Sequence, residues 1–241
     1  MFNKLKIKSK LLLGFISVAV VVGIVGYVGH NGMSKGTESI EEIAEVRLPS
    51  IQNLLVILEG KTGVWVAERG LINQNMMDPV VRQAQYDYIN EKFEAIDEAW
   101  SIYAPLPQTP EETVEWNRFV KLWDDWKADH EEVVRLSKER DRLVASGVPE
   151  DDVRVETLLT QAFEASLVAR QSSLEAEEVL HKIIDINTTV AQEFEEEAYA
   201  TASNSAILLI IFIAIGVVLA IVLGFVIASN IQGIIRSIVS Q

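Results

Sequence analysis

Two apolar runs, one near each end of the chain, constrain its fold more than any other feature. Residues 11–29 and 206–228 carry no charged side chain over 19 and 23 positions. A helix of the shorter length spans about 28 Å, close to the hydrocarbon thickness of a bilayer. The first run is longer than the apolar part of a cleaved signal peptide, although Gly26 and Gly29 leave cleavage open as an alternative. We therefore predict two transmembrane helices.

The distribution of charge predicts how these helices are oriented. Basic residues flank the two runs on their outer sides: Lys4, Lys6, Lys8, Lys10 and Arg236. The positive-inside rule then places 1–10 and 229–241 in the cytoplasm and 30–205 outside. All 35 acidic residues lie within 30–205, against 16 of the 21 basic ones, which gives this segment a net charge of about −19. Such a field repels nucleic acid and anionic lipid, so we exclude nucleic acid as a partner.

The outer segment reads as helices separated by three breaks. Proline, glycine and cap-forming residues concentrate at 76–81, 104–112 and 145–152. In the second break, Thr109 followed by Pro110 predicts a helix N-cap. Apolar side chains then recur at spacings of 3 and 4, which is typical of a seam that faces other helices. On the third helix they are Trp116, Phe119, Trp123, Trp126, His130, Val133 and Ser137; on the fourth they run from Leu159 through Ala176 and Asn187 to Phe194. We predict an all-α fold, an antiparallel up-down four-helix bundle continuous with both transmembrane helices.

Residues suited to catalysis or metal binding are scattered. The chain has no cysteine, and its three histidines lie far apart in the sequence. It also lacks a glycine-rich phosphate loop and a nucleophile motif. We therefore expect no enzyme activity, no cofactor and no metal site. His130 lies on the apolar seam of the third helix, where a hydrogen-bonded core residue is the expected role.

Three stretches carry a resemblance to a known family: "RLPSIQNLLVILEGKTGVWVAERGLINQ", "LWDDWKADHEEVVRLSKERDRL" and "LHKIIDINTTVAQEFEEEA". Together with the two apolar runs, they resemble the sensor half of a methyl-accepting chemotaxis receptor. The resemblance implies a homodimer in the bacterial cytoplasmic (inner) membrane, with the sensor domain in the periplasm or outside the cell. The tail "SNIQGIIRSIVSQ" at 229–241 is similar to the start of a HAMP linker, although it lacks the usual proline. We therefore expect a signalling output beyond Gln241 that engages adaptor and kinase proteins.

One position on the first helix suggests a ligand site. Arg69 interrupts a stripe of Leu48, Ile51, Leu55, Leu58, Thr62, Trp65 and Ile72, and an arginine buried there would need a partner. Counting residues away from the membrane places Ser166 and Arg170 of the fourth helix at the same height. Two guanidinium groups at one level suit a carboxylate, and the family binds amino acids through first-helix arginines between two subunits. We predict that a small organic acid or amino acid binds at Arg69, Asn73, Ser166 and Arg170. Open alternatives are that Arg69 pairs with a glutamate, that it reaches solvent, or that the signal is a periplasmic binding protein.

The second apolar run suggests how a signal would cross the bilayer. Small residues recur every four positions at Gly216, Ala220, Gly224 and Ala228, which favours close packing against a neighbouring helix. No proline lies between 153 and 228, and the first glycine there is Gly216, as a stiff connecting helix requires. We predict that the fourth helix and the second span transmit ligand binding as one unit. Alternatives are the sensor of a histidine kinase or cyclase, or a structural membrane tether without a ligand.

Overall fold

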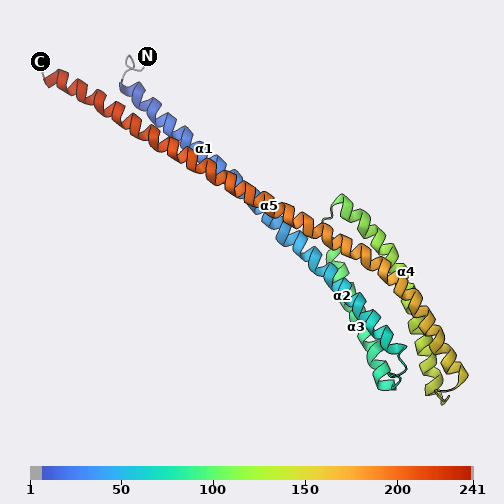
Figure 1. The fold of residues 1–241 in the computed structure, drawn as a ribbon. Coiled ribbons are helices and arrows are strands. Elements are labelled where there is room, and N and C mark those ends of the chain that lie inside the picture. Colours follow the sequence, from blue (N-terminus) through green and yellow to red (C-terminus); the bar gives the residue numbers. More distant parts are fainter. Residues whose placement is uncertain (1–6, 240–241) are drawn as a thin grey trace. The chain divides into compact units, whose positions relative to one another are not determined.

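The structure, a computed structural model, describes residues 7–239, and the elements in this range are helices (Figure 1). The first helical stretch comprises α1 (Ile7–Glu41), the short π-helix η2 (Glu42–Arg47) and α2 (Leu48–Leu71). It is followed by α3 (Pro79–Tyr103), α4 (Pro110–Ala145) and α5 (Val153–Val239). The chain divides into two compact units, here called the apolar unit (Met1–Glu41 with Glu193–Gln241) and the bundle unit (Glu42–Gln192). Lys4 and Lys6 of the predicted cytoplasmic flank lie outside the described residues.

The ends of the helices follow from local sequence chemistry. The side chain of Asp78 caps α3 by accepting hydrogen bonds from two backbone N–H groups of its first turn, at 2.9 and 3.2 Å. Thr109 and Glu112 form a capping box at the start of α4, each side chain accepting from the backbone N–H of the other. The predicted cap at Thr109 is confirmed. The turn between α4 and α5 uses Gly147 at a φ of 94°, a conformation that side chains with a Cβ disfavour.

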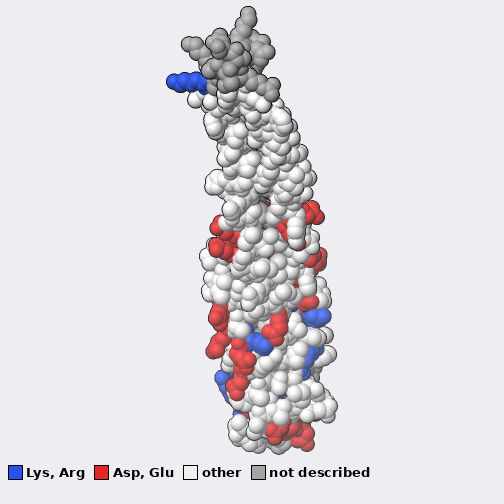
Figure 2. All heavy atoms as spheres, turned by 90° about the vertical axis from the view of Figure 1, so that its left-hand side faces the viewer, with Lys and Arg blue, Asp and Glu red and all other residues white. Residues whose placement is uncertain are grey.

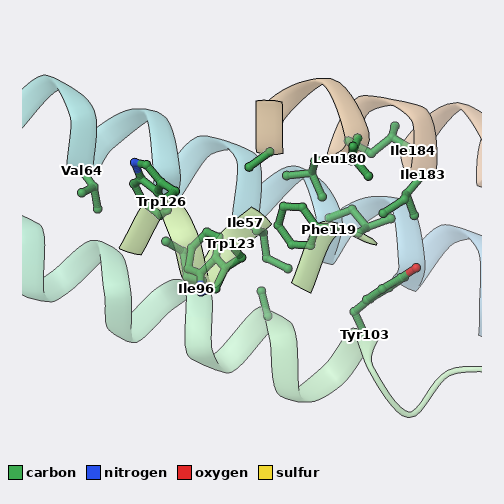
Figure 3. Packing of buried hydrophobic residues seen from close by; sticks show 14 of the residues in the cluster. Ile57, Val64, Ile96, Tyr103, Phe119, Trp123, Trp126, Leu180, Ile183 and Ile184 are labelled. Carbon is green, nitrogen blue, oxygen red and sulfur yellow. The ribbon is translucent and has the colours of Figure 1, made fainter. Parts of the chain in front are cut away.

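The bundle unit packs α2, α3, α4 and the first part of α5 around one apolar core, which confirms the predicted fold class. Figure 3 shows how side chains from the four helices meet there: Ile57, Val64, Ile96, Tyr103, Phe119, Trp123, Trp126, Leu180, Ile183 and Ile184. The predicted seam on α4 is buried along its whole length, and that on α5 is buried from Ala162 to Asn187. Aromatic rings dominate the centre, with the Trp100 and Trp116 centroids 4.5 Å apart.

The predicted stripe on the first helix of the bundle is wrong by one residue. Side chains buried in the bundle recur at spacings of 3 and 4, but at Arg47, Ser50, Leu54, Ile57, Lys61, Val64, Glu68 and Leu71. The stripe chosen from the sequence is displaced by one position, and its members Leu48 and Leu55 are 55% and 47% exposed. Arg69, expected to be buried, is only partly so. The predicted stripe is the more apolar of two neighbouring stripes, whereas the core side includes three charged residues that pair with side chains of other helices.

Glycines allow α2 and α3 to approach closely. A Cβ added to Gly60 would lie 2.5 Å from Cγ1 of Ile96, well inside van der Waals contact. A Cβ on Gly70 would lie 2.7 Å from Oε1 of Gln85. The missing side chains therefore set the distance between these two helices, since cores at close packing leave no room for an additional methyl group.

The apolar unit pairs α1 with the last part of α5. Both helices are long and apolar enough to cross a membrane, with peak mean hydropathies of 2.6 and 3.5, and Figure 2 shows the surface of these segments nearly free of charge. They approach closely at Gly32, where an added Cβ would collide with Oγ of Ser205. At one end of the pair, Lys10 Nζ donates a hydrogen bond to Oδ1 of Asn230 at 2.9 Å. The span limits 11–29 and 206–228 stay a prediction.

The small residues that recur every four positions on α5 face α1 only in part. A Cβ on Gly216 would lie 3.2 Å from Val21 Cγ1, so this position packs against α1. Ala220 and Ala228 are exposed, and Gly224 has open space around it within the described residues. The packing role of these three positions therefore stays a prediction that requires a helix from another chain.

Candidate functional site

Two arginines predicted to lie at one height meet on the same tryptophan. Trp65 lies on α2, and the guanidinium carbon of Arg69, one turn later, is 5.6 Å from its ring centroid. The guanidinium carbon of Arg170 on α5 is 4.6 Å from the same centroid. Among the described residues neither guanidinium forms an ion pair, so the pairing of Arg69 with a glutamate is not observed. The two cations are held by a π face, an interaction that leaves their N–H groups available.

The indole nitrogen of Trp65 is a further polar group at this position. Its Nε1 atom is buried and has no hydrogen-bond partner within the described part of the chain. A buried donor without a partner costs free energy. Trp65, Arg69 and Arg170, here called the Trp65 cluster, therefore offer one indole donor and two guanidinium groups on the α2–α5 side of the bundle.

The structure places Ser166 and Asn73 away from this role. Ser166 is fully buried in the core seam of α5, and its hydroxyl donates to the backbone carbonyl of Phe163 at 2.7 Å. Asn73 is exposed in the turn after α2, where its Oδ1 accepts from the backbone N–H of Asn75 at 2.9 Å. No described contact joins either residue to the Trp65 cluster, and a ligand role for Arg69 and Arg170 stays a prediction.

Buried charges on the core side of α2 were missed from the sequence. Lys61 is 1% exposed, and its Nζ donates to Oε2 of Glu177 on α5 at 3.1 Å. Burial lowers the pKa of Lys61, while the hydrogen bond to Glu177 partly offsets that effect. Two turns along, the carboxylate of Glu68 lies 2.8 Å from Nδ1 of His130, and both residues are buried. His130 is therefore the hydrogen-bonded core residue that its position predicted.

A second buried polar network lies where η2 begins the bundle unit. The guanidinium of Arg47, 3% exposed, donates to Glu112 at 2.9 Å and to Oδ1 of Asn187 at 3.0 Å. Glu112, which is fully buried, also accepts from Tyr103 and from Asn187, each at 2.7 Å. Burial and the hydrogen bond to Glu112 raise the pKa of Tyr103, so its hydroxyl stays protonated and donates. This network, here called the Arg47 network, connects the start of α2 with α3, α4 and α5.

The π-helical turn brings Arg47 into the network. A π-helix carries one extra residue per turn and is commonly found at functional positions of a longer helix. In η2, Arg47 also contacts the carboxylate of Glu42, with Nη2 at 2.7 Å from Oε1. The 3–4 repeat from Arg47 to Leu71 was the sequence signal that could have located these buried charges.

Comparison with known families gives one result over most of the chain. A family model described as a four helix bundle sensory module for signal transduction matches residues 4–202. No curated protein and no solved structure matches the chain. A sensory module of this kind has no catalytic role. The chain belongs to the family of four-helix-bundle sensory modules for signal transduction, as found in receptors of the methyl-accepting type.

Proposed function

We propose that this chain is the sensory part of a transmembrane chemoreceptor, which detects a signal outside the cell and transmits it through α5. The observation that carries the proposal is the continuity of α5, a single helix of 87 residues from Val153 to Val239. Its first part contributes a core seam to the bundle, and its last part contains the apolar run. In the proposed mechanism, ligand binding displaces this helix, and the displacement is transmitted along it to the cytoplasmic side.

The proposed topology places both termini in the cytoplasm of a bacterial cell and the bundle unit on the outer side of the inner membrane. Because the chain has no cysteine, one introduced thiol is a unique label. We expect Ser101→Cys on α3 to react with a membrane-impermeant maleimide in intact cells, and Gln232→Cys to react only after lysis. Both positions are exposed. Labelling of Gln232→Cys in intact cells would contradict the topology.

The proposed ligand is a small organic acid or amino acid that binds the Trp65 cluster through its carboxylate. Guanidinium groups donate two parallel hydrogen bonds to such a group. We expect a ligand to raise the melting temperature of the chain, because it binds only the folded state. Arg69→Gln and Arg170→Gln should abolish that shift, whereas Arg135→Gln, an exposed arginine of α4, should preserve it. A shift that survives in both cluster variants would remove the site.

The proposed assembly is a homodimer that meets on the half-exposed stripe of α2. Leu48 and Leu55 on this stripe remain about half exposed in the single chain, and apolar stripes at this spacing pack against partner helices. We expect Leu55→Cys to form a disulfide between two chains under mild oxidation in membranes. Ser101→Cys on α3 is the matched control, which should form no disulfide between chains. Equal crosslinking at both positions would indicate random collision.

A further inference from the structure

A cleft between α3 and α4 has the opposite charge from the rest of the bundle unit. It has a volume of about 550 Å³ and lies between the start of α3 and the end of α4. Its walls include four cationic side chains and one acidic side chain, and the residues that matter here are Arg82, Tyr86, Lys138, Arg140, Asp141 and Arg142. The predicted outer segment has a net charge of about −19. A local excess of three positive charges in one cleft therefore requires a physical explanation.

Two of the four cationic side chains are buried. Arg82 and Arg140 are 2% and 4% exposed, and they share a single carboxylate. Arg82 Nε and Arg140 Nη1 both donate to the same oxygen, Oδ1 of Asp141, at 2.6 and 3.0 Å. The other oxygen, Oδ2, accepts from the hydroxyl of Tyr86 at 2.7 Å. One carboxylate thus serves two buried guanidinium groups, and both of its oxygens are occupied.

Arg140 keeps unused hydrogen-bonding capacity. Its Nε atom is buried and has no hydrogen-bond partner in the described structure. Its Nη2 atom lies 3.6 Å from Glu150, whose own side chain is 57% exposed. An incompletely compensated buried charge is unfavourable, and a second anion would relieve it. The arrangement therefore favours an anion that enters from the cleft.

The rim and walls of the cleft add to this preference. Lys138 and Arg142 are exposed at its edge, with Lys138 Nζ 5.5 Å from the centroid of the Tyr86 ring. Val144 and Ala145 supply apolar wall next to these charges. A ligand with a short carbon or phosphoanhydride skeleton and several negative groups matches this combination of buried guanidinium groups and exposed rim charges.

We propose that this cleft binds a small molecule that carries at least two carboxylate or phosphate groups. Arg140, with Arg82 behind it, holds one group in the buried part of the cleft. Lys138 and Arg142 contact the other group at the rim. The site uses α3 and α4, so it is separate from the Trp65 cluster on α2 and α5.

The test uses the full chain in detergent, with citrate and pyrophosphate as probes and glucose as the uncharged control. Sodium chloride at matched ionic strength separates binding from screening. We expect at least one of the two anions to raise the melting temperature in a saturable manner and to give a calorimetric binding isotherm. Citrate alone would identify a carboxylate site, and pyrophosphate alone a phosphate site. No response to either anion would overturn the proposal.

Substitutions in the cleft test which side chains bind the anion. Arg140→Met should weaken binding at least tenfold, because hydrogen bonds between charged groups are the strong ones. It should not lower the melting temperature of the ligand-free chain, since Asp141 keeps Arg82 and Tyr86. Lys138→Gln with Arg142→Gln changes only exposed residues and should also weaken binding severalfold.

Two controls distinguish this site from other sources of binding. Arg135→Gln on the same helix should bind as the unchanged chain does, and so should Arg69→Gln with Arg170→Gln. Anion binding unaffected by Arg140→Met and by the rim variant would overturn the proposal. Loss of binding only in the Trp65 cluster variants would do the same while supporting the proposed ligand site.

Discussion

The Arg47 network should make Glu112→Gln one of the most destabilising conservative changes in the chain. The carboxylate of Glu112 is fully buried and accepts four hydrogen bonds, from Arg47, Asn187, Tyr103 and the backbone of Thr109. Glutamine keeps the shape but removes the buried negative charge beside Arg47, which leaves Arg47 only the partly exposed carboxylate of Glu42. Breaking a buried ion pair from one side costs about 3–5 kcal/mol. At roughly 2–4 °C per kcal/mol for a unit of this size, the melting temperature should fall by about 6–20 °C.

The assay follows the bundle unit alone, because all five tryptophans lie between residues 65 and 126. Tryptophan emission of the full chain in detergent therefore reports unfolding of the bundle. Glu111→Gln is the matched control, since the Glu111 side chain is 67% exposed and should change stability by less than about 0.5 kcal/mol. Thr109→Ala removes the cap alone, at about 1 kcal/mol. A loss for Glu112→Gln no larger than that of Thr109→Ala would refute the role assigned to the ion pair.

Two further predictions concern packing and pH. Gly60→Ala should destabilise the bundle unit by up to about 2 kcal/mol, because overpacking against Ile96 outweighs a helix-propensity gain of about 1 kcal/mol. Gly63→Ala, whose Cβ would meet only a flexible lysine stem at 3.0 Å, should be neutral or stabilising in the same melting experiment. The hydrogen bond from the Arg154 guanidinium lowers the pKa of Asp152 to about 2. This depressed pKa adds stability above pH 4 that is lost as the pH falls towards 2, so the melting temperatures of Asp152→Asn and the unchanged chain should converge over that interval; a constant difference would contradict the ion pair.

Local sequence chemistry was sufficient to predict the ends of the helices and two of the core seams. The cap at Thr109 depends on residues within one turn, so no distant contact can override it. The seam on α4 is rich in tryptophan and phenylalanine, whose burial outweighs any alternative register. The seam on α5 contains alanine and serine instead, but its 3–4 spacing is uninterrupted. On α5 the spacing, and not polarity, located the seam, because Ser166 and Asn187 are buried while Leu167 is 51% exposed.

The same reasoning failed on α2 because its core register is the more polar one. Lys61 and Glu68 are acceptable in the interior only because Glu177 and His130 face them from other helices. The identity of those partners is tertiary information, which the spacing of residues along α2 does not contain. The neighbouring stripe, with Leu48 and Leu55, has the stronger apolar signal but remains half exposed. An apolar stripe beside an already complete core is the pattern expected when a helix has a further packing partner.

The buried charges of α2 also bear on how α5 transmits a displacement. Apolar contacts are nondirectional. The core-facing side chains between Ala162 and Ala176 on α5 are small, so apolar packing alone does little to fix the position of this part of the helix. Hydrogen bonds are directional, and two of them fix α5 against the first helix of the bundle: Lys61 to Glu177 and Arg47 to Asn187. These acceptors are ten residues, or about 15 Å, apart along α5. A slide or rotation of α5 by even part of a turn must break both bonds together. In the proposed mechanism, the two polar contacts therefore define the resting position from which ligand binding would displace α5.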